Sequence, residues 1–331
     1  MEKLVRVFCD SPIDFKYKSI FSGIDNLDVI SGGFFSIVKE IINLKDKNAI
    51  YHFRYLKFRG YIFTLMRLVF IIALAKMKSV KIVWSCHNVY EHTFKSKFYN
   101  DLIRNIVIFF SDSIVVFHSD IKSRLPSYCH KKVYVATFGD MKAHFLCQNQ
   151  ANVDFENKLK SWRENHKGNL NIISISTAKK NNLRCLNDGK GIFSLIIAPN
   201  LDIGFSTSNT CMVYNDGFVK KEVVDLLMSS ERLVGFVGHD NLSVPTSIYM
   251  YASFGIPIIS LDNVPSNNIV YRNSLGKVLC DYSDLHHVYN EIYHNYEFYS
   301  SNCKGFIEKC SWKHSSDVHT QMLAALLRNS V

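Results

Sequence analysis

The chain has 331 residues, of which 47% are hydrophobic and 21% are charged. This composition is typical of a globular protein, because it is too apolar for a disordered chain and too polar for a bundle of membrane helices. The longest uncharged apolar run in the first half, residues 68–75, is far shorter than the roughly 20 residues that span a membrane. The nine cysteines contain no C-x-x-C pair, and the N-terminal segment lacks the apolar stretch of a signal peptide. We therefore expect reduced thiols in a cytosolic protein, and exclude a disulfide scaffold, a zinc module and an integral membrane protein.

The net charge of +10 is carried entirely by the first half. Residues 1–150 contain 22 Lys and Arg against 12 Asp and Glu, whereas residues 151–331 contain 17 of each kind. This asymmetry predicts a polyanionic partner: nucleic acid, an anionic bilayer or a phosphate-bearing substrate. Because the chain has no ribonucleoprotein motif, zinc-finger spacing or basic zipper, we expect no nucleic-acid partner. Residues 51–81 mix basic with aromatic and aliphatic side chains, which favours a surface for anionic lipid, although a basic helix packed on a sheet has the same composition.

Short apolar runs alternate with helical patterns along the first half of the chain. We expect strands at residues 4–8, 26–30, 49–53, 80–86, 113–118 and 132–136. Helices are expected at residues 35–44, 59–78, 97–110 and 119–125. This alternation, with several continuously apolar strands, predicts a parallel sheet covered by helices on both faces.

A polar stretch at residues 148–167 is the expected linker, and the alternation restarts after it. Strands are expected at residues 170–174, 193–197, 212–214, 233–237 and 256–261. Helices are expected at residues 220–229, 246–254, 285–298 and 314–328. The sequence therefore predicts two α/β units of similar size, with a ligand site at the carboxyl ends of their strands.

Polar residues follow the strand at 80–86 in the order Ser-Cys-His-Asn-Val-Tyr-Glu-His. An imidazole at this position, His87, can exchange a hydrogen bond or a proton with a hydroxyl near neutral pH, although a structural loop histidine is an equal alternative. Glu91 and His92 come within the next turn, and Asp10 ends the first expected strand. The chain has no G-x-G-x-x-G after that strand, no P-loop and no G-x-S-x-G elbow, which argues against a nicotinamide enzyme, a P-loop enzyme and a serine hydrolase.

A second segment combines a helix start with two hydroxyls. Pro245 precedes Thr246 and Ser247, which begin the helix expected at 246–254. Free amides and hydroxyls at a helix N-terminus suit a pyrophosphate, while simple N-capping accounts for the same residues equally well.

The segments at residues 84–92, 111–119 and 246–259 resemble those of GT-B glycosyltransferases. His87-Asn88 is similar to the His-Asn or His-Asp pair that the large retaining family of this class places after its fourth strand. Residues 214–222 and 246–259 more closely resemble bacterial glucosyl- and galactofuranosyltransferases of O-antigen and adhesin-glycan assembly. The resemblance implies an α/β protein of two facing Rossmann-like domains with the active site between them. The acceptor domain would be residues 1–155 and the nucleotide-sugar domain residues 166–331, with the helix at 314–328 packing back on the first.

The resemblance also implies roles for individual residues. His87, Asp10 and Glu91 are the candidates for catalysis: any of them could deprotonate the acceptor in an inverting reaction, and His87 could orient the donor sugar in a retaining one. Asn88 and His92 would contact the acceptor. The residues expected at the donor are Lys180 or Arg184 for the phosphates, Tyr214 for the nucleoside, and His239, Asn241, Thr246, Ser247 and Tyr249.

Two positions depart from the family patterns. Met250 stands where the retaining family has a ribose-binding Glu, and Pro245 stands where the O-antigen group has a diphosphate-binding Lys. The ribose and phosphate contacts must then come from other residues, or the donor is unusual.

The expected function is that of a metal-independent hexosyltransferase that needs no cofactor. It would move sugar from a nucleoside-diphosphate donor, a UDP-sugar, to a lipid-linked oligosaccharide during synthesis of O-antigen, lipopolysaccharide, capsule or exopolysaccharide. The expected location is the cytoplasm, peripherally attached to the inner face of the cell membrane. The alternatives are a catalytically degenerate subunit that stabilises an active transferase, and a sugar-nucleotide epimerase of the same fold.

Overall fold

The structure is a computed structural model, and it describes residues 4–45, 48–56, 60–89, 96–142, 157–158, 160–161, 170–175, 180–187, 191–198, 210–214, 232–239, 243–262 and 265–328. The chain forms two compact units. The first unit comprises Met1–Phe138, Leu242–Val244 and Ser311–Val331, and the second comprises Gly139–Asn241 and Pro245–Cys310. Within the described ranges, no helix is both long and apolar enough to cross a membrane.

The first unit contains a six-stranded parallel sheet with the order β2-β1-β3-β4-β5-β6. Its strands are β1 (Val5–Cys9), β2 (Leu27–Ser31), β3 (Ala49–Phe53), β4 (Lys81–Cys86), β5 (Ser113–Val116) and β6 (Val133–Val135). Its helices are α1 (Phe15–Phe21), α2 (Phe34–Ile42), α3 (Tyr61–Met77), α4 (Lys97–Phe110), α5 (Ser119–Arg124), the 3-10 helix η1 (Ser127–Lys132) and α14 (Trp312–Arg328). The strand order reverses between β1 and β3, where a parallel sheet of this kind opens a ligand site.

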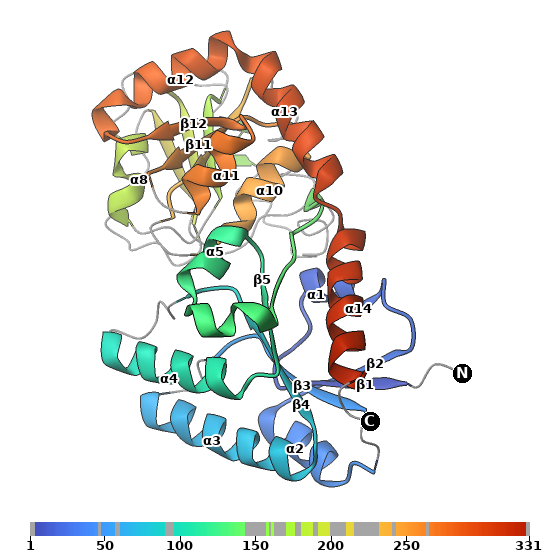
Figure 1. Cartoon of the computed structure of the whole chain (residues 1–331). Helices are drawn as coiled ribbons and strands as arrows, with labels where there is room; N and C mark the ends of the chain where they lie inside the picture. Colours follow the sequence, from blue (N-terminus) through green and yellow to red (C-terminus); the bar gives the residue numbers. More distant parts are fainter. Residues whose placement is uncertain are drawn as a thin grey trace. The chain divides into compact units, whose positions relative to one another are not determined.

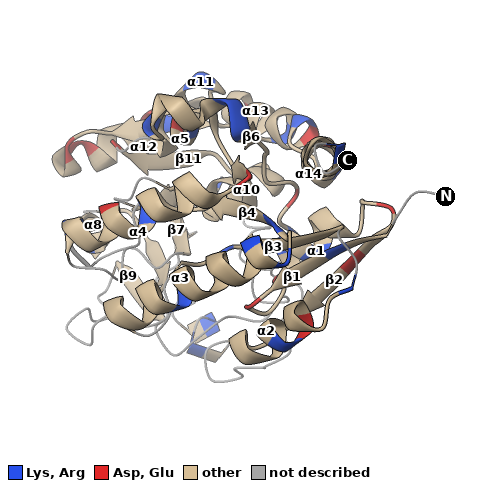
Figure 2. Cartoon of the chain, turned by 60° about the horizontal axis from the view of Figure 1, so that its bottom comes forward, with Lys and Arg blue, Asp and Glu red and all other residues tan. Residues whose placement is uncertain are grey.

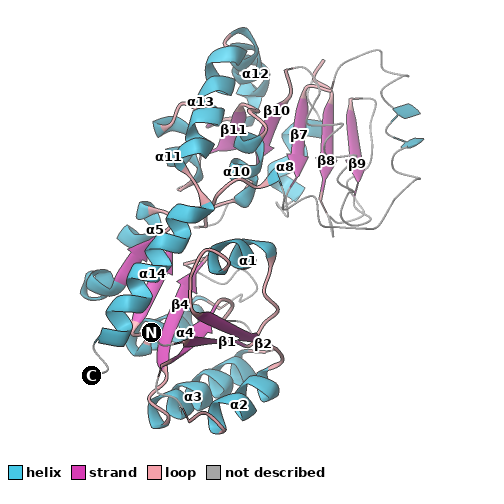
Figure 3. Ribbon diagram, turned by 90° about the vertical axis from the view of Figure 1, so that its right-hand side faces the viewer, coloured by secondary structure: helices cyan, strands magenta, loops and turns pink. Residues whose placement is uncertain are grey.

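The helices of the first unit form two layers on opposite faces of its sheet. The β1–β2 connection runs opposite to the later ones, so right-handed crossovers place α1 on one face and α2, α3 and α4 on the other (Figure 1). Helix α14 joins the α1 layer, where Ser316 donates a hydrogen bond to the carbonyl of Ile20 and the Trp312 ring meets Phe15 edge-on. Figure 3 shows the α2–α3 pair on the side of the sheet away from α1.

The second unit contains another six-stranded parallel sheet, with the order β12-β11-β10-β7-β8-β9. Figure 3 labels the five strands from β11 to β9 in this order. Its strands are β7 (Ile172–Ile175), β8 (Ser194–Ile197), β9 (Cys211–Tyr214), β10 (Val234–Val237), β11 (Ile258–Leu261) and β12 (Gly276–Leu279). Its other elements are α8 (Lys180–Asn187), α10 (Thr246–Ser253), α11 (Ser266–Arg272), η2 (Tyr282–Asp284), α12 (Leu285–His294) and α13 (Tyr296–Lys309). Numbered from β7, this is the 3-2-1-4-5-6 order of nucleotide-binding Rossmann sheets, with its switch point between β7 and β10.

Most elements expected from the sequence are present, and the prediction of parallel sheets is confirmed. The prediction of a single helix at 285–298 is wrong, because two helices cover this segment. Helix α12 ends before Asn295, and α13 begins after it and continues to Lys309. Helices α1, α8 and α11 and strand β12 were not expected. The expected helix at 220–229 and most of the expected linker at 148–167 lie outside the described residues.

Candidate active site

Polar side chains gather at the carboxyl edge of the first sheet. Asp10 follows β1, Arg54 follows β3 and His87 follows β4. Because β1 and β3 flank the switch point, these residues occupy the edge at which α/β sheets bind ligands.

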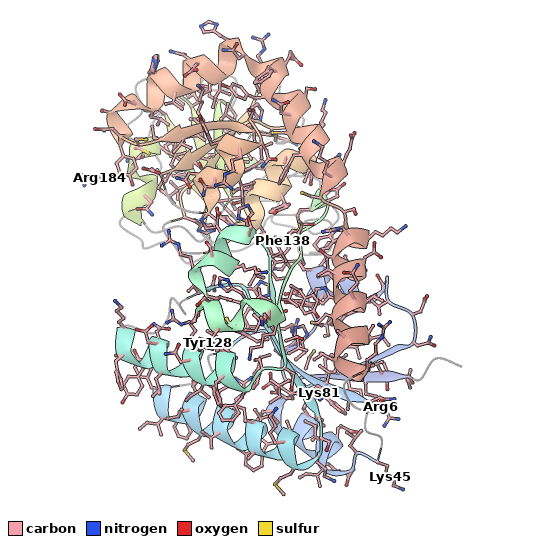
Figure 4. The ribbon with its side chains drawn as sticks, viewed as in Figure 1. Arg6, Lys45, Lys81, Tyr128, Phe138 and Arg184 are labelled. Carbon is pink, nitrogen blue, oxygen red and sulfur yellow. The ribbon has the colours of Figure 1, made fainter. Side chains whose placement is uncertain are left out.

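His87 is held by one hydrogen bond and by flat contacts with aromatic rings. Its Nε2 lies 2.8 Å from the hydroxyl of Tyr17 in α1. Its ring stacks on Phe117 at 5.0 Å between centroids and on Tyr55 at 5.9 Å. Phe138, labelled in Figure 4, stacks on Phe117 at 4.3 Å and extends this aromatic cluster. His87 therefore has a fixed ring plane, and only its Nδ1 has no hydrogen-bond partner among the described residues.

The surroundings of His87 keep it neutral. Burial, together with the positive charges of Lys16 and Arg54, lowers the pKa of His87 well below its ordinary value. Burial also raises the pKa of Tyr17 well above its ordinary value, so the phenol keeps its proton. When Nε2 donates its proton to the Tyr17 oxygen, Nδ1 carries a lone pair and can accept a proton from a substrate hydroxyl. The arrangement thus suits either a weak general base or a hydrogen-bonding group for a sugar hydroxyl.

Arg54 is a buried cation at this edge with an incomplete set of partners. It is 2% exposed, and its Nη2 donates to the hydroxyl and the carbonyl of Ser11 at 2.7 and 2.6 Å. The guanidinium packs over the Tyr17 ring at 4.9 Å, while Nε and Nη1 have no hydrogen-bond partner in the described part of the chain. Burial lowers the pKa of the neighbouring Lys16. Two crowded cations make this edge attractive to an anionic group.

Asp10, in contrast, is fully engaged with a cation from α3. Its Oδ2 accepts a hydrogen bond from Nε of Arg67 at 2.7 Å and another from Nη2 of the same side chain. Arg67 also donates to the carbonyl of Leu56, and the two side chains of the ion pair are only 4% and 3% exposed. The Oδ2 atom is thus occupied by the Arg67 guanidinium, and the buried ion pair ties α3 to the end of β1. The geometry therefore favours a structural role for Asp10 over the catalytic role expected from the sequence.

The second unit has a pocket at the carboxyl edge of its sheet, close to the switch point. The pocket has a volume of about 270 Å³. It is lined by Asn182, His239, Leu261, Asp262, Leu279, Cys280 and Tyr282. Asn182 of α8 donates a hydrogen bond of 2.9 Å to the carbonyl of Gly238, which fixes the start of the loop after β10. The expected donor residue His239 thus lies in a hollow that offers both amide and carboxylate groups.

Helix α10 starts in the same loop region with an unpartnered hydroxyl. Ser247 is 7% exposed and its Oγ has no hydrogen-bond partner within the described ranges. Pro245 is the N-cap and makes no side-chain capping bond, so capping by Thr246 or Ser247 is not what the structure has. The first amides of an α-helix have no intrahelical partner and carry the positive end of the helix dipole. A buried hydroxyl at this place is suited to an anionic ligand.

The body of α10 is anchored under the sheet. Tyr251 accepts a hydrogen bond from the amide of Ile175 and donates one to the carbonyl of Ile173, both in β7. Gly235 in β10 leaves the space for the Tyr251 ring, because a Cβ there would lie 2.4 Å from ring atoms. The start of α10 is thereby held at fixed distance from β7 and β10, the two strands at the switch point.

The other expected donor residues have varied surroundings. Arg184 is exposed on α8 (Figure 4), and Tyr214 is buried at the end of β9. Tyr249 is 1% exposed and packs on Phe306 of α13, which makes it a core residue. Lys180 begins α8, but its side chain lies outside the description.

Of the expected acceptor and catalytic residues, Asn88 is half-buried and forms an isolated antiparallel bridge with Ser243. Glu91, His92 and Asn241 lie outside the described residues.

Three residues of the two edges were not found from the sequence. Tyr17 was missed because α1 was not expected, and Arg54 was counted only as part of a basic segment. Asp262 directly follows β11, so the rule that ligands bind at strand ends could have identified it. In the part of the chain that the structure describes, no group of three or more His, Cys, Asp and Glu side chains could hold a metal ion.

Comparison with known proteins shows the fold. No protein-family model matches the sequence, and no curated protein matches it either. HepE from Anabaena in complex with UDP-glucose has a TM-score of 0.63 at 10% identity, over 98% of this chain and 100% of HepE. A glycosyltransferase from Rickettsia africae has a TM-score of 0.58 at 14% identity, over 99% of this chain and 100% of that one. UDP-GlcNAc 2-epimerase from Neisseria meningitidis bound to UDP-GlcNAc has a TM-score of 0.57 at 12% identity, over 98% of this chain and 100% of the epimerase. The chain has the GT-B fold, as its motifs predicted.

Proposed function

We propose that the protein is a glycosyltransferase that moves a sugar from a nucleoside-diphosphate donor, a UDP-sugar, to a hydroxyl of a lipid-linked oligosaccharide. The observation that carries the proposal is the start of α10, where the buried Ser247 hydroxyl has no hydrogen-bond partner among the described residues and lies in the first turn of the helix. This helix follows β10, one of the two strands at the switch point of a Rossmann-order sheet.

The second unit would bind the donor. The α10 amides and the hydroxyls of Thr246 and Ser247 would hold the diphosphate, and Arg184 or Lys180 of α8 would add positive charge. The pocket after β10, β11 and β12 would take the nucleoside, with Asp262 accepting hydrogen bonds from ribose hydroxyls. Asp262 would then take the role of the ribose-binding glutamate, whose position is occupied here by Met250. HepE in complex with UDP-glucose supports a uridine donor, because it has the same fold over nearly its whole length.

The reaction breaks the bond between the anomeric carbon and the diphosphate oxygen and forms a bond from that carbon to the acceptor oxygen. The helix start stabilises the charge that develops on the departing diphosphate. In an inverting reaction Nδ1 of His87 accepts the proton of the acceptor hydroxyl. In a retaining reaction His87 instead orients a donor hydroxyl, and the leaving diphosphate takes the proton. Tyr17 fixes the His87 tautomer in either case.

The first unit would bind the acceptor. The buried Arg54 and the half-buried Lys16, next to His87, suit the phosphate groups that link an oligosaccharide to its lipid. The basic excess of residues 1–150 would favour an anionic membrane, which we place at the inner face of the cell membrane, where such acceptors are extended. The pathway we infer is the synthesis of a bacterial surface polysaccharide such as O-antigen, lipopolysaccharide or capsule.

The donor site can be tested by calorimetric titration of UDP into the wild type and a Ser247→Ala variant. A hydrogen bond to a charged ligand contributes about 1.5–3 kcal/mol, so the Kd should rise roughly tenfold or more. Ser194→Ala is the matched control, because Ser194 is also buried with an unpartnered hydroxyl but begins β8, at the opposite edge of the sheet. An unchanged Kd in Ser247→Ala would remove the diphosphate from α10.

The epimerase of the same fold is the second candidate, because UDP-GlcNAc 2-epimerase from Neisseria meningitidis matches this chain at full length. An epimerase needs no acceptor, so incubation with UDP-GlcNAc alone followed by chromatography separates the two functions. Conversion of the sugar without acceptor would favour the epimerase. Failure to bind any nucleotide would favour a degenerate subunit, as the Met250 and Pro245 departures permit.

A further inference from the structure

The solvent-facing side of α3 in the first unit is almost entirely apolar. Its residues are Ile62, Phe63, Met66, Val69, Phe70 and Met77, each at least 50% exposed. They recur every three or four residues and therefore share one side of the helix, which we call the apolar face. Figure 2, turned to bring this part forward, draws α3 with little charge along its length.

Helix α3 is apolar on its exposed side as well as on its buried side, whereas an ordinary surface helix turns its charges to water. Thr64 and Arg67 are buried: Thr64 donates to the carbonyl of Gly60, and Arg67 is paired with Asp10. The exposed charge of the helix is Lys76, near its C-terminal end, which pairs with Asp112. Packing against the sheet therefore does not account for the apolar face. The sequence has kept apolar side chains where the fold leaves them in contact with water.

The neighbouring helices extend the apolar face on both sides. The rings of Phe34 in α2 and Phe70 in α3 meet at 6.2 Å, and Tyr61 of α3 stacks on Tyr99 of α4 at 4.6 Å. Beyond these contacts, Phe35 of α2 is 80% exposed and Phe98 of α4 is 70% exposed. The three helices thus form one layer with a shared apolar exterior. Single exposed apolar residues are common on protein surfaces, but a continuous apolar surface of this kind marks an interaction site.

The charges around the apolar face identify its occupant. Lys39 of α2, Lys45 after it and Lys97 at the start of α4 are exposed, and Lys78 after α3 donates to the carbonyl of Ile42 at the end of α2. Figure 4 labels Lys45 on this part of the unit. A second copy of the chain would present the same positively charged surroundings, which do not complement these lysines. An anionic bilayer offers both an apolar interior and opposite charge.

We infer that the apolar face of α2, α3 and α4 inserts into the interface of an anionic lipid bilayer, with the surrounding lysines at the headgroups. The proposed function supplies only a reason for this contact, namely an acceptor carried on lipid. The inference itself stands on exposure and charge in the first unit, so it can fail while donor binding in the second unit remains. The contact is peripheral, because the three helices lie along the surface of their unit.

Sedimentation with vesicles tests the inference. The wild type should bind phosphatidylcholine vesicles that contain phosphatidylglycerol, and weakly bind pure phosphatidylcholine. The triple variant Ile62→Gln, Met66→Gln, Val69→Gln keeps the charge and should lower the partition coefficient by about tenfold or more, since each replaced side chain loses its apolar burial. The matched control, Tyr271→Gln with Phe298→Gln, changes exposed apolar residues of the second unit and should bind as the wild type does. Equal binding by the triple variant and the wild type would overturn the inference.

A second measurement detects insertion directly. Tryptophan fluorescence of a Phe63→Trp variant should be quenched by vesicles with brominated acyl chains, and that of Phe298→Trp should not. Equal quenching of both variants, or of neither, would contradict an inserted α3. If sedimentation equilibrium shows a dimer that the triple variant abolishes, the apolar face is an interface between copies instead. UDP titration of the triple variant should match the wild type, which separates failure here from failure of the proposed donor site.

Discussion

Replacing Asp10 by Asn separates the structural role of this residue from a catalytic one. The substitution keeps the shape but removes the charge that pairs with Arg67, leaving a guanidinium that is 4% exposed without its counter-ion. Breaking a buried ion pair by removing one partner costs roughly 3–5 kcal/mol. For a chain of 331 residues the entropy of unfolding is about 0.7 kcal/mol/K, so this loss should lower Tm by about 4–7 °C.

The control is a second ion pair in the same sheet. Arg6 in β1 and Asp28 in β2 are 3.5 Å apart, with side chains that are 36% and 40% exposed. An exposed pair contributes less than about 1 kcal/mol, so Asp28→Asn should change the free energy of unfolding little. The double variant Asp10→Asn, Arg67→Met should recover part of the stability, because neither charge is then left unpaired.

Urea unfolding followed by circular dichroism gives the free energies of all four proteins. UDP binding by Asp10→Asn should remain normal while the protein is folded, because the proposed donor site lies in the second unit and Asp10 lies in the first. An Asp10→Asn variant with wild-type stability but no transfer activity would refute the structural assignment. Asp10 would then have to be restored as a candidate base.

Two further predictions concern the histidines of the first unit. Tyr17→Phe should reduce kcat and leave the Kd for UDP unchanged, because it removes the hydrogen bond that holds the His87 ring. His87→Ala should abolish transfer, and near-normal kcat in either variant would remove that residue from the mechanism. Stability should fall as the pH decreases below about 6.5, because burial lowers the pKa values of His52, His87 and His319, the last to about 4, so that the unfolded chain binds protons that the folded one does not. Below a pH of about 6.5, each of these histidines should lower the free energy of unfolding by up to about 1.4 kcal/mol for each pH unit. Urea titrations in which the free energy of unfolding does not depend on pH would contradict the neutral buried state.

The sequence predicted the sheets well because their signal is local. Buried parallel strands are short apolar runs, and the expected bounds of the strand at 49–53 match β3 residue for residue. Asn295 was harder to place, because α12 and α13 both have helical periodicity and the break depends on their different packing partners: α12 lies against β12, and α13 lies against α10. Helix α1 was missed because its charged residues obscure the pattern, although Asp14 caps it by accepting from the amide of Tyr17.

The sites were less accessible to sequence reasoning because they depend on distant partners. Arg67 is 57 residues from Asp10 in the sequence, and nothing in the local sequence around either residue shows that the two form an ion pair. Arg67 and Arg54 were both expected as surface charge, yet both are buried. Placement at strand ends selected His87, and the same rule would also have selected Asp262 and His239, which line the pocket of the second unit.

The central claim is that the second unit binds a nucleoside-diphosphate sugar, and thermal unfolding with a panel of nucleotides tests it most directly. UDP, GDP, CDP and dTDP, each alone and as a common sugar conjugate, would be added to the wild type in large excess. The account predicts selective stabilisation by UDP and UDP-sugars, by about 2.7 kcal/mol when the ligand is at 100 times its Kd. Stabilisation by none of these ligands would contradict the account and would favour a protein that supports another enzyme.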